Sequence, residues 1–237
     1  MQMTSVGEAA RAGAIAVLPV GATEQHGPHL ATGTDTLLAE RVSVAAAART
    51  GDVVLPAIPY GCSLGHTAHW PGTISLHPAT MTAVVVEVGR WSHASGFHKL
   101  VLVNGHATNG PPCQSALLQL RHELPDLRPR FVSLFELSPE IAARYAEDAP
   151  DFHANEAETS LMMHLEAGAV DTSAITDEPD RTIGRVLLYP MPAVTTSGVV
   201  GAPSRASATR GAALFEQLVD ALAGLLLAAR AERDPEL

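Results

Sequence analysis

The sequence contains little positive charge, few aromatic residues and only two cysteines. Lys and Arg number 15 against 25 Asp and Glu, which gives a formal net charge of −10, and the basic residues form no cluster. This balance argues against a nucleic acid or an anionic membrane as a binding partner. Cys62 and Cys113 lie far apart and form no CxxC pair. The cysteine content therefore gives no indication of a disulfide framework.

Several targeting segments and motifs are absent as well. The N-terminus has no basic segment followed by an apolar one, and no run approaches 18 apolar residues, so we expect a cytoplasmic protein without a membrane partner. The motifs GxGxxG and GxxxxGK[ST] do not occur, which argues against dinucleotide and P-loop chemistry. Ser63 lies in no GxSxG elbow, so serine hydrolysis is a poor fit.

The chain is rich in aliphatic residues, because 46% of it is hydrophobic while only 4% is aromatic. Apolar runs of strand length alternate with segments of helical period. We expect strands at 14–20, 53–61, 99–106 and 130–137, helices at 35–50, 78–95, 113–124, 155–168 and 210–233, and a further candidate strand at 185–190 within a loop-rich stretch, 171–209. Continuous apolar strands separated by helices are typical of a parallel sheet covered on both faces. We therefore predict a single α/β domain over residues 1–237.

Polar motifs follow three of the expected strands. TEQHG comes after the first strand, YGCSLGH after the second and NGHATN after the third. In open parallel α/β sheets, ligands bind outside the carboxyl ends of the strands. We therefore expect these motifs to lie together at one edge of the sheet.

The first and third motifs contain side chains that bind metals. Glu24 and His26 are two residues apart, so on extended backbone they point the same way. Asp35 follows near a helix start, and His106 ends the third strand. Oxygen and imidazole ligands suit divalent Zn, Mn or Fe. An isolated Glu-x-His pair more often makes ordinary loop hydrogen bonds, but the addition of Asp35 and His106 favours a metal site.

Five segments together resemble the creatininase family in order and approximate spacing. They are LPVGATEQHGPHLATGTDTLLAE, PYGCSLGHTAHWPGTISL, LVLVNGHATNG, DFHANEAETSLMM and SGVVGAPSRASATRGAALFE. The resemblance extends from about residue 14 to 220. It implies a three-layer α/β/α sandwich with a mostly parallel sheet. It also implies a dinuclear metal hydrolase, since members act mainly on the carbon–nitrogen bonds of creatinine, of formamides or of a precursor peptide in mycofactocin maturation.

The resemblance also implies how the metals are held. Glu24, Asp35 and His106 would hold one ion, and His26 with Asp35 the other, which needs one more carboxylate. Creatininase itself has an acidic residue two positions after the strand-end histidine, where this chain has Thr108. We therefore expect the missing carboxylate to be Glu158, with Glu156 as the second choice and a plain helix N-terminal role as the alternative for Glu158. The same departure weakens the case for creatinine as substrate.

Other residues have expected roles beside the metals. His153 matches the family's histidine near the metals and could protonate the leaving nitrogen, although a core histidine that only makes hydrogen bonds is the alternative. Glu158 and Glu156 are the carboxylates that could share this proton transfer. His66 and Trp70 are expected to line the substrate pocket, although Trp70 fits a core or interface position equally well. Thr73 is a further candidate for substrate binding, with a turn-forming role as the commoner alternative.

The predicted function is hydrolysis of an amide-type carbon–nitrogen bond in a small molecule, with two divalent ions per chain. Alternatives within enzymes are a mycofactocin-type precursor-peptide peptidase and a ring-opening hydrolase of a sugar-derived or lactone carbonyl. The alternative outside enzymes is a binding or assembly subunit that has kept the scaffold and the metals. Family members often form homo-oligomers, including hexamers, and the apolar helix at 212–229 could supply such an interface or simply cover the sheet.

Overall fold

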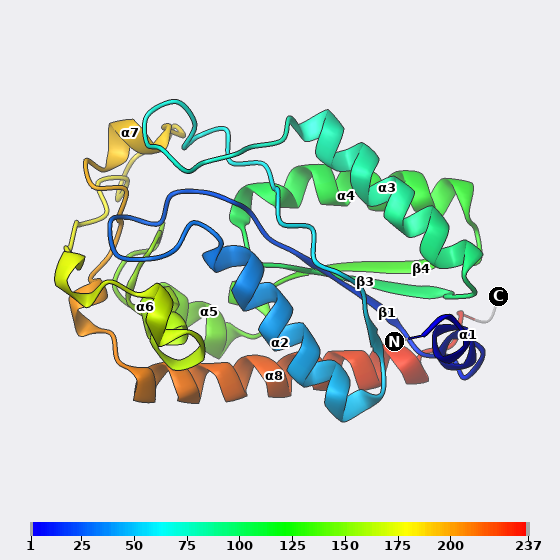
Figure 1. Ribbon diagram of the computed structural model, residues 1–237. Helices are drawn as coiled ribbons and strands as arrows, with labels where there is room; N and C mark the ends of the chain where they lie inside the picture. The colour runs from blue at the N-terminus through cyan, green and yellow to red at the C-terminus, as the bar shows by residue number, and fades with distance from the viewer. Residues whose placement is uncertain (1, 236–237) are drawn as a thin grey trace.

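The computed structural model describes residues 2–235, which form a parallel four-stranded sheet between two layers of helices (Figure 1). The strands are β1 (Ala16–Val20), β2 (Val53–Val54), β3 (Lys99–Asn104) and β4 (Arg128–Ser133), in the spatial order β2-β1-β3-β4. Each neighbouring pair is parallel. The predicted α/β/α architecture is therefore confirmed.

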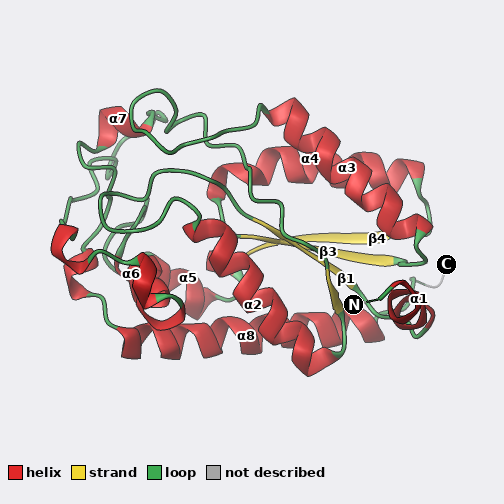
Figure 2. Cartoon of the chain, viewed as in Figure 1, coloured by secondary structure: helices red, strands yellow, loops and turns green. Residues whose placement is uncertain are grey.

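The rest of the chain forms helices and long loops (Figure 2). They are α1 (Met3–Arg11), α2 (Thr34–Thr50), α3 (Pro78–Ala94), α4 (Gly110–Glu123), α5 (Pro139–Tyr145), α6 (Glu156–Leu165), α7 (Met191–Val194) and α8 (Ala208–Ala231). Three of them, α1, α5 and α7, were not expected from the sequence pattern. They are short, and a short helix offers too few turns for a periodic signal.

The two faces of the sheet support two separate hydrophobic cores. Val101 and Val103 of β3 pack into one core, while Leu100 and Leu102 pack into the other. Alternate residues of a strand point to opposite faces, so a strand covered on both sides reads as a continuous apolar run. Helices α2, α6 and α8 cover the first face, and α3 and α4 cover the second (Figure 1).

Three expected strands differ from the structure. The strand predicted at 130–137 ends at Ser133, and a 3-10 turn follows it from Leu134. The strand predicted at 53–61 ends at Val54, and only a single bridge between Val20 and Ile58 continues it. Pro56 and Pro59 interrupt this run, and proline has no N–H to donate to a neighbouring strand. The candidate strand at 185–190 is wrong, because this segment is an exposed loop in which Leu188 is fully accessible.

Helix α8 packs along α2 and α6 and buries Leu214, Leu218, Leu222 and Leu226. It is long and apolar enough to span a membrane by length and composition alone, a test that core helices of soluble proteins also pass. Of the larger apolar residues on its outer side, Leu227 is half exposed. The buried side of the apolar stretch at 212–229 therefore covers one face of the sheet.

The strand order reverses between β1 and β3. From β1 the chain passes through α2 to β2 on one side, and after α3 it returns to β3 on the other side of β1. Loops that leave two such strands diverge, and the crevice between them is where doubly wound folds bind ligands. Gly105 allows α2 to begin directly against this crevice, since a Cβ there would lie 2.4 Å from the Asp35 carbonyl oxygen.

Candidate metal centre

Four of the predicted ligands lie together beyond the carboxyl ends of β1 and β3. Glu24 and His26 come from the loop after β1, Asp35 from the first turn of α2 and His106 from the end of β3. The Nδ1 atom of His106 lies 3.2 Å from a Glu24 oxygen and 3.4 Å from an Asp35 oxygen. His26 Nε2 lies 3.1 Å from the other Asp35 oxygen. All four side chains are buried.

Helix α6 brings a fifth predicted ligand, Glu158, to the same place. The ligand atoms of His26, Asp35 and Glu158 lie within 4.8 Å of one another, and so do those of Glu24, Asp35 and His106. Asp35 belongs to both groups, with one oxygen facing each imidazole. Two three-residue groups that share a carboxylate have the composition of a dinuclear centre.

Hydrogen bonds at their outer nitrogen atoms fix the orientation of His26 and His106. His26 Nδ1 donates to the Glu24 carbonyl oxygen at 3.2 Å, and His106 Nε2 donates to the Cys62 carbonyl oxygen at 2.9 Å. A carbonyl can only accept, so these outer nitrogens carry the protons. The inner nitrogens, which face Asp35 and Glu24, are then the ones available to a metal. Metal-binding histidines are commonly fixed in this way.

The inner polar atoms have few partners of their own. Within residues 2–235, both Glu24 carboxylate oxygens, His26 Nε2, one Asp35 oxygen and one Glu158 oxygen are buried and make no hydrogen bond. Buried carboxylates without partners are costly, because their hydration is lost without replacement. A divalent cation among these atoms would satisfy them, so the residues present fit the metals that the sequence predicts.

The charges in the centre shift several pKa values. Burial lowers the pKa of His26, but the charge of Asp35, with Glu158 and Glu24 behind it, raises the pKa to about 10. Burial raises the pKa of Glu158 to about 7, against the opposing effect of His26. His106 keeps the pKa of Glu24 well below its usual value despite burial. Without metal, the protons on the imidazoles provide the positive charge that these carboxylates require.

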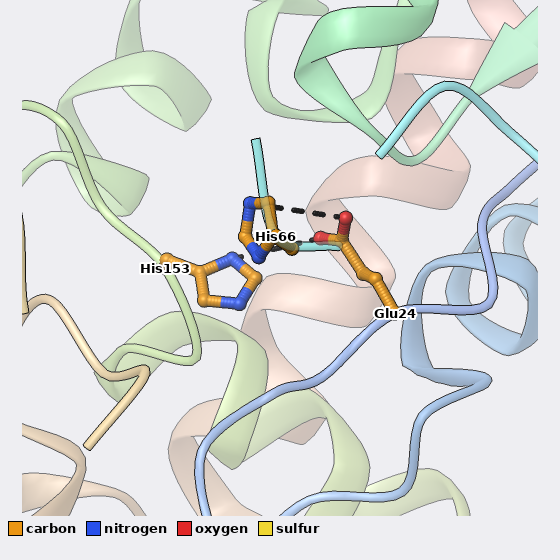
Figure 3. Close-up of side chains that lie close together, drawn as sticks. All are labelled: Glu24, His66 and His153. Carbon is orange, nitrogen blue, oxygen red and sulfur yellow. Dashed lines mark ion pairs between the residues drawn. The ribbon is translucent and has the colours of Figure 1, made fainter. Parts of the chain in front are cut away.

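His153 and His66 lie beside the Glu24 carboxylate (Figure 3). His153 Nε2 donates to the Gln25 carbonyl oxygen at 2.8 Å, so its Nδ1 faces Glu24, 3.7 Å from the carboxylate. Burial and the nearby charge of His26 lower the pKa of His153 to about 3, which keeps this ring neutral. His66 Nε2 lies 3.9 Å from the other Glu24 oxygen, and the His66 and His153 ring centroids are 4.6 Å apart.

Gln25 positions both of these rings, a role that the sequence pattern did not reveal. Its side-chain oxygen accepts from the Gly27 N–H, which leaves the amide N–H₂ to donate to His66 Nδ1 at 3.0 Å and to the Gly198 carbonyl oxygen. His66 therefore carries its proton on Nε2, directed at Glu24. Gly198 approaches so closely that a Cβ there would lie 1.9 Å from the Gln25 side-chain oxygen.

The loop that contains Gly198 is held by a buried carboxylate. Glu178 accepts hydrogen bonds from the hydroxyls of Thr195 and Ser197 and from the Thr196 and Ser197 N–H groups. These bonds outweigh the effect of burial and lower the pKa of Glu178 far below its usual value. The polar stretch after residue 171 thus supports the centre through Glu178 and Gly198.

The remaining predicted residues lie elsewhere. Glu156 faces away from the ligands and is bound by Arg144 and by Arg210 Nε, the latter at 2.8 Å. Thr73 accepts from the Gln25 N–H at 3.0 Å, a long-range contact that connects the loop of Thr73 to Gln25 and does not form a turn. Trp70 is half buried and packs against His69, with ring centroids 4.5 Å apart.

Three polar residues around β3 also support the centre. Asn104 donates to the His106 carbonyl oxygen and accepts from the His106 N–H, which fixes the turn that directs this histidine inward. Asn109 in turn donates to Asn104. Thr108, where creatininase itself has an acidic residue, lies 2.6 Å from His106 Nε2 and donates to the Cys62 carbonyl oxygen. Their polar side chains in NGHATN were visible in the sequence, but their partners were not.

Comparison with known proteins agrees with this geometry. The profile of the creatininase family, described as creatinine amidohydrolase, matches residues 1–226. The chain belongs to the creatininase family. It is 32% identical over 226 residues to the creatinine amidohydrolase of Pseudomonas putida, covering 88% of this chain and 87% of that protein. This membership makes the chain a hydrolase that acts on carbon–nitrogen bonds.

Two further similarities bear on the details. The mycofactocin precursor peptide peptidase of Mycolicibacterium smegmatis is also 32% identical, over 87% of this chain and 82% of that protein. A crystal structure of creatinine amidohydrolase superposes with a TM-score of 0.88 at 29% identity and covers 98% of this chain and 97% of that one. Solved creatininases include a Mn form and a variant of Zn–Zn type.

Proposed function

We propose that the chain is a dinuclear metal-dependent amidohydrolase. Glu24, Asp35 and His106 would hold one divalent ion, and His26, Asp35 and Glu158 the other. Two such ions, when bound, supply an activated water and polarise the carbonyl of the scissile bond. The proposal rests on Asp35, which belongs to both buried groups. Several inner carboxylate oxygens of these groups have no hydrogen-bond partner. Zn, Mn and Fe all accept this ligand set.

His153 is proposed to transfer the proton. The Gln25 carbonyl oxygen keeps its proton on Nε2, so neutral His153 presents a free Nδ1 beside Glu24. This atom can accept a proton from the attacking water and then deliver it to the nitrogen of the leaving group. Delivery matters because an amide nitrogen would otherwise leave as a strongly basic anion.

His66 is proposed to orient the substrate. Gln25 holds the His66 ring with its Nε2 proton directed at the centre, and burial lowers the pKa of His66, so the ring is a neutral donor. A carbonyl oxygen bound beside Glu24 would accept from this N–H. Trp70 and Thr73 belong to the same loop, and we expect Trp70 to contact the rest of the substrate while Thr73 supports Gln25.

The substrate is proposed to be a small molecule with an amide-type bond. Thr108 in place of an acidic residue argues against creatinine itself. The equal similarity to a peptidase makes a short peptide the second candidate. The test is a screen of metal-loaded protein against linear amides, formamides, cyclic ureas and short peptides. Turnover of a small amide but of no peptide supports the proposal, whereas turnover of peptides alone would replace it with the second candidate.

We also propose that a single domain assembles into a cytoplasmic homo-oligomer. Ile183, Val186, Leu187 and Leu188 are each at least 70% exposed, and this segment adjoins the His66 loop through a hydrogen bond from the Met191 N–H to the Gly65 carbonyl oxygen. Contiguous exposed apolar residues commonly mark an interface. The two free, buried cysteines suit a reducing compartment. Light scattering that gives a monomer at micromolar concentration would contradict the oligomer.

A further inference from the structure

A second group of metal-binding side chains lies at the opposite end of the sheet. His93 belongs to the last turn of α3, His98 directly precedes β3, and Asp126 lies in the turn between α4 and β4. The six residues of β3 span about 20 Å, so this group is remote from His106 at the other end of the strand. It is therefore independent of the proposed dinuclear centre.

The three side chains converge on one point. His93 Nε2 lies 3.0 Å from one Asp126 oxygen, and His98 Nδ1 lies 3.1 Å from the other. One ligand atom from each residue lies within 4.8 Å of the other two. Ligand atoms of a tetrahedral zinc site, with bonds of about 2.0–2.2 Å, are about 3.3–3.6 Å apart. Only small side-chain shifts separate the observed arrangement from such a site.

The backbone holds these positions in place. The His93 carbonyl oxygen accepts from the Gly96 N–H, and the His98 carbonyl oxygen accepts from the Arg128 N–H. His93 is also the final basic residue of α3, where the negative end of the helix dipole favours a cation. The Arg128 guanidinium, which belongs to a residue two positions after Asp126, is paired with Asp234. Because Asp126 and His98 are about 60% exposed, water can complete the coordination of an ion.

We propose that His93, His98 and Asp126 form a separate binding site for one first-row divalent transition metal ion. Two imidazoles and a carboxylate suit Zn²⁺, Ni²⁺ or Cu²⁺ better than Ca²⁺ or Mg²⁺, which prefer oxygen ligands. In the absence of metal, the imidazole N–H groups donate to Asp126, and an ion takes the place of those protons. The bound ion connects the end of α3 to the start of β4.

The test compares the number of ions bound by several proteins at increasing free Zn²⁺, using equilibrium dialysis and elemental analysis. We expect the wild-type chain to bind one ion more than His93→Ala, His98→Ala and Asp126→Asn, and His122→Ala, an exposed histidine of α4, to match the wild type. The difference in ion count between the wild-type chain and these variants does not depend on how many ions the dinuclear centre holds. A failure of the proposed His93–His98–Asp126 site can therefore be distinguished from a failure of the proposed dinuclear centre. His98→Ala changes a mostly exposed side chain and so tests the site even if His93→Ala misfolds.

Copper provides a second readout. Electron paramagnetic resonance of Cu²⁺ added to the zinc-loaded protein should show nitrogen coupling from two imidazoles, and this signal should be lost in His98→Ala but kept in His122→Ala. Equal ion counts in the wild-type chain, His98→Ala and Asp126→Asn would overturn the proposal.

Discussion

Glu156 and Glu158 are two residues apart at the start of α6, but the two faces of this helix provide opposite environments. Glu156 is surrounded by cations: Arg144 and Arg210 bind its carboxylate and lower its pKa. Glu158 lies with Asp35 and Glu24, and burial together with these carboxylates raises its pKa to about 7. The arginines neutralise Glu156 within the chain, whereas the opposing charge that acts on Glu158 comes from His26, which is charged only when it is protonated. The comparison indicates where the protein leaves room for an external cation.

The largest effect is expected for Asp35→Ala, because Asp35 belongs to both ligand groups. We expect the variant to lose both ions and all measurable activity. Glu40→Ala, which changes an exposed carboxylate on the same helix, serves as the control and should keep both. An Asp35→Ala protein that keeps two ions would contradict the shared-ligand arrangement.

Glu158→Gln tests directly whether Glu158 is a metal ligand. The side chain keeps its shape but loses its charge, so the group formed with His26 and Asp35 is left with one carboxylate. We expect turnover to fall close to background even with excess metal, as measured in a continuous assay with the best substrate from the screen. Turnover near that of the wild-type chain would show that Glu158 is not a ligand.

His153→Ala separates proton transfer from metal binding. We expect turnover to fall about 10²–10⁴-fold, the usual effect of removing a positioned acid or base, while the ion content stays unchanged. His122→Ala provides a control for the loss of a histidine elsewhere. Loss of an ion from His153→Ala would mean that its free Nδ1 is a ligand instead of a proton carrier.

Glu156→Gln should have the smallest effect on catalysis and a clear effect on stability. The substitution leaves Arg144 and Arg210 without an ionised partner. We expect the free energy of unfolding to fall by roughly 2–4 kcal/mol, because Glu156 is buried; the partial exposure of Arg210 limits the loss. The pKa of Glu156 is lowered in the folded protein, so its stabilising effect is complete above the unfolded pKa near 4.5 and is lost as pH falls through the folded value.

Urea denaturation at a series of pH values measures this difference. The gap in unfolding free energy between the wild-type chain and Glu156→Gln should be largest at neutral pH and should shrink below about pH 4.5. A gap that stays constant down to pH 3 would argue that the effect does not come from the ionised carboxylate.

Much of the fold follows from local pattern. β1 and β3 were predicted because a strand buried on both faces must be apolar at each position. The apolar residues at 185–190 match a strand equally well, but no neighbouring strand pairs with them, and sequence alone does not show pairing. The second strand was predicted too long because its apolar residues outweighed the two prolines.

The part of the site that follows from the topology of the parallel sheet could be predicted from the sequence. Glu24, His26 and His106 follow strands that had to end at one edge, so their proximity followed from a parallel sheet. Glu158 belongs to α6, which does not directly follow a strand of the sheet, and only the family resemblance suggested it. The role of Gln25 could not be predicted, because it depends on which nitrogen of His66 and His153 carries the proton.

The ion content of three proteins tests whether Glu158, and not Glu156, holds the second metal ion. Wild-type chain, Glu158→Gln and Glu156→Gln are saturated with Zn²⁺ or Mn²⁺, freed of loosely bound ions and analysed for metal per chain. We expect Glu158→Gln to hold one ion fewer than the wild-type chain and Glu156→Gln to hold the same number. Loss of an ion from Glu156→Gln with full retention by Glu158→Gln would contradict it.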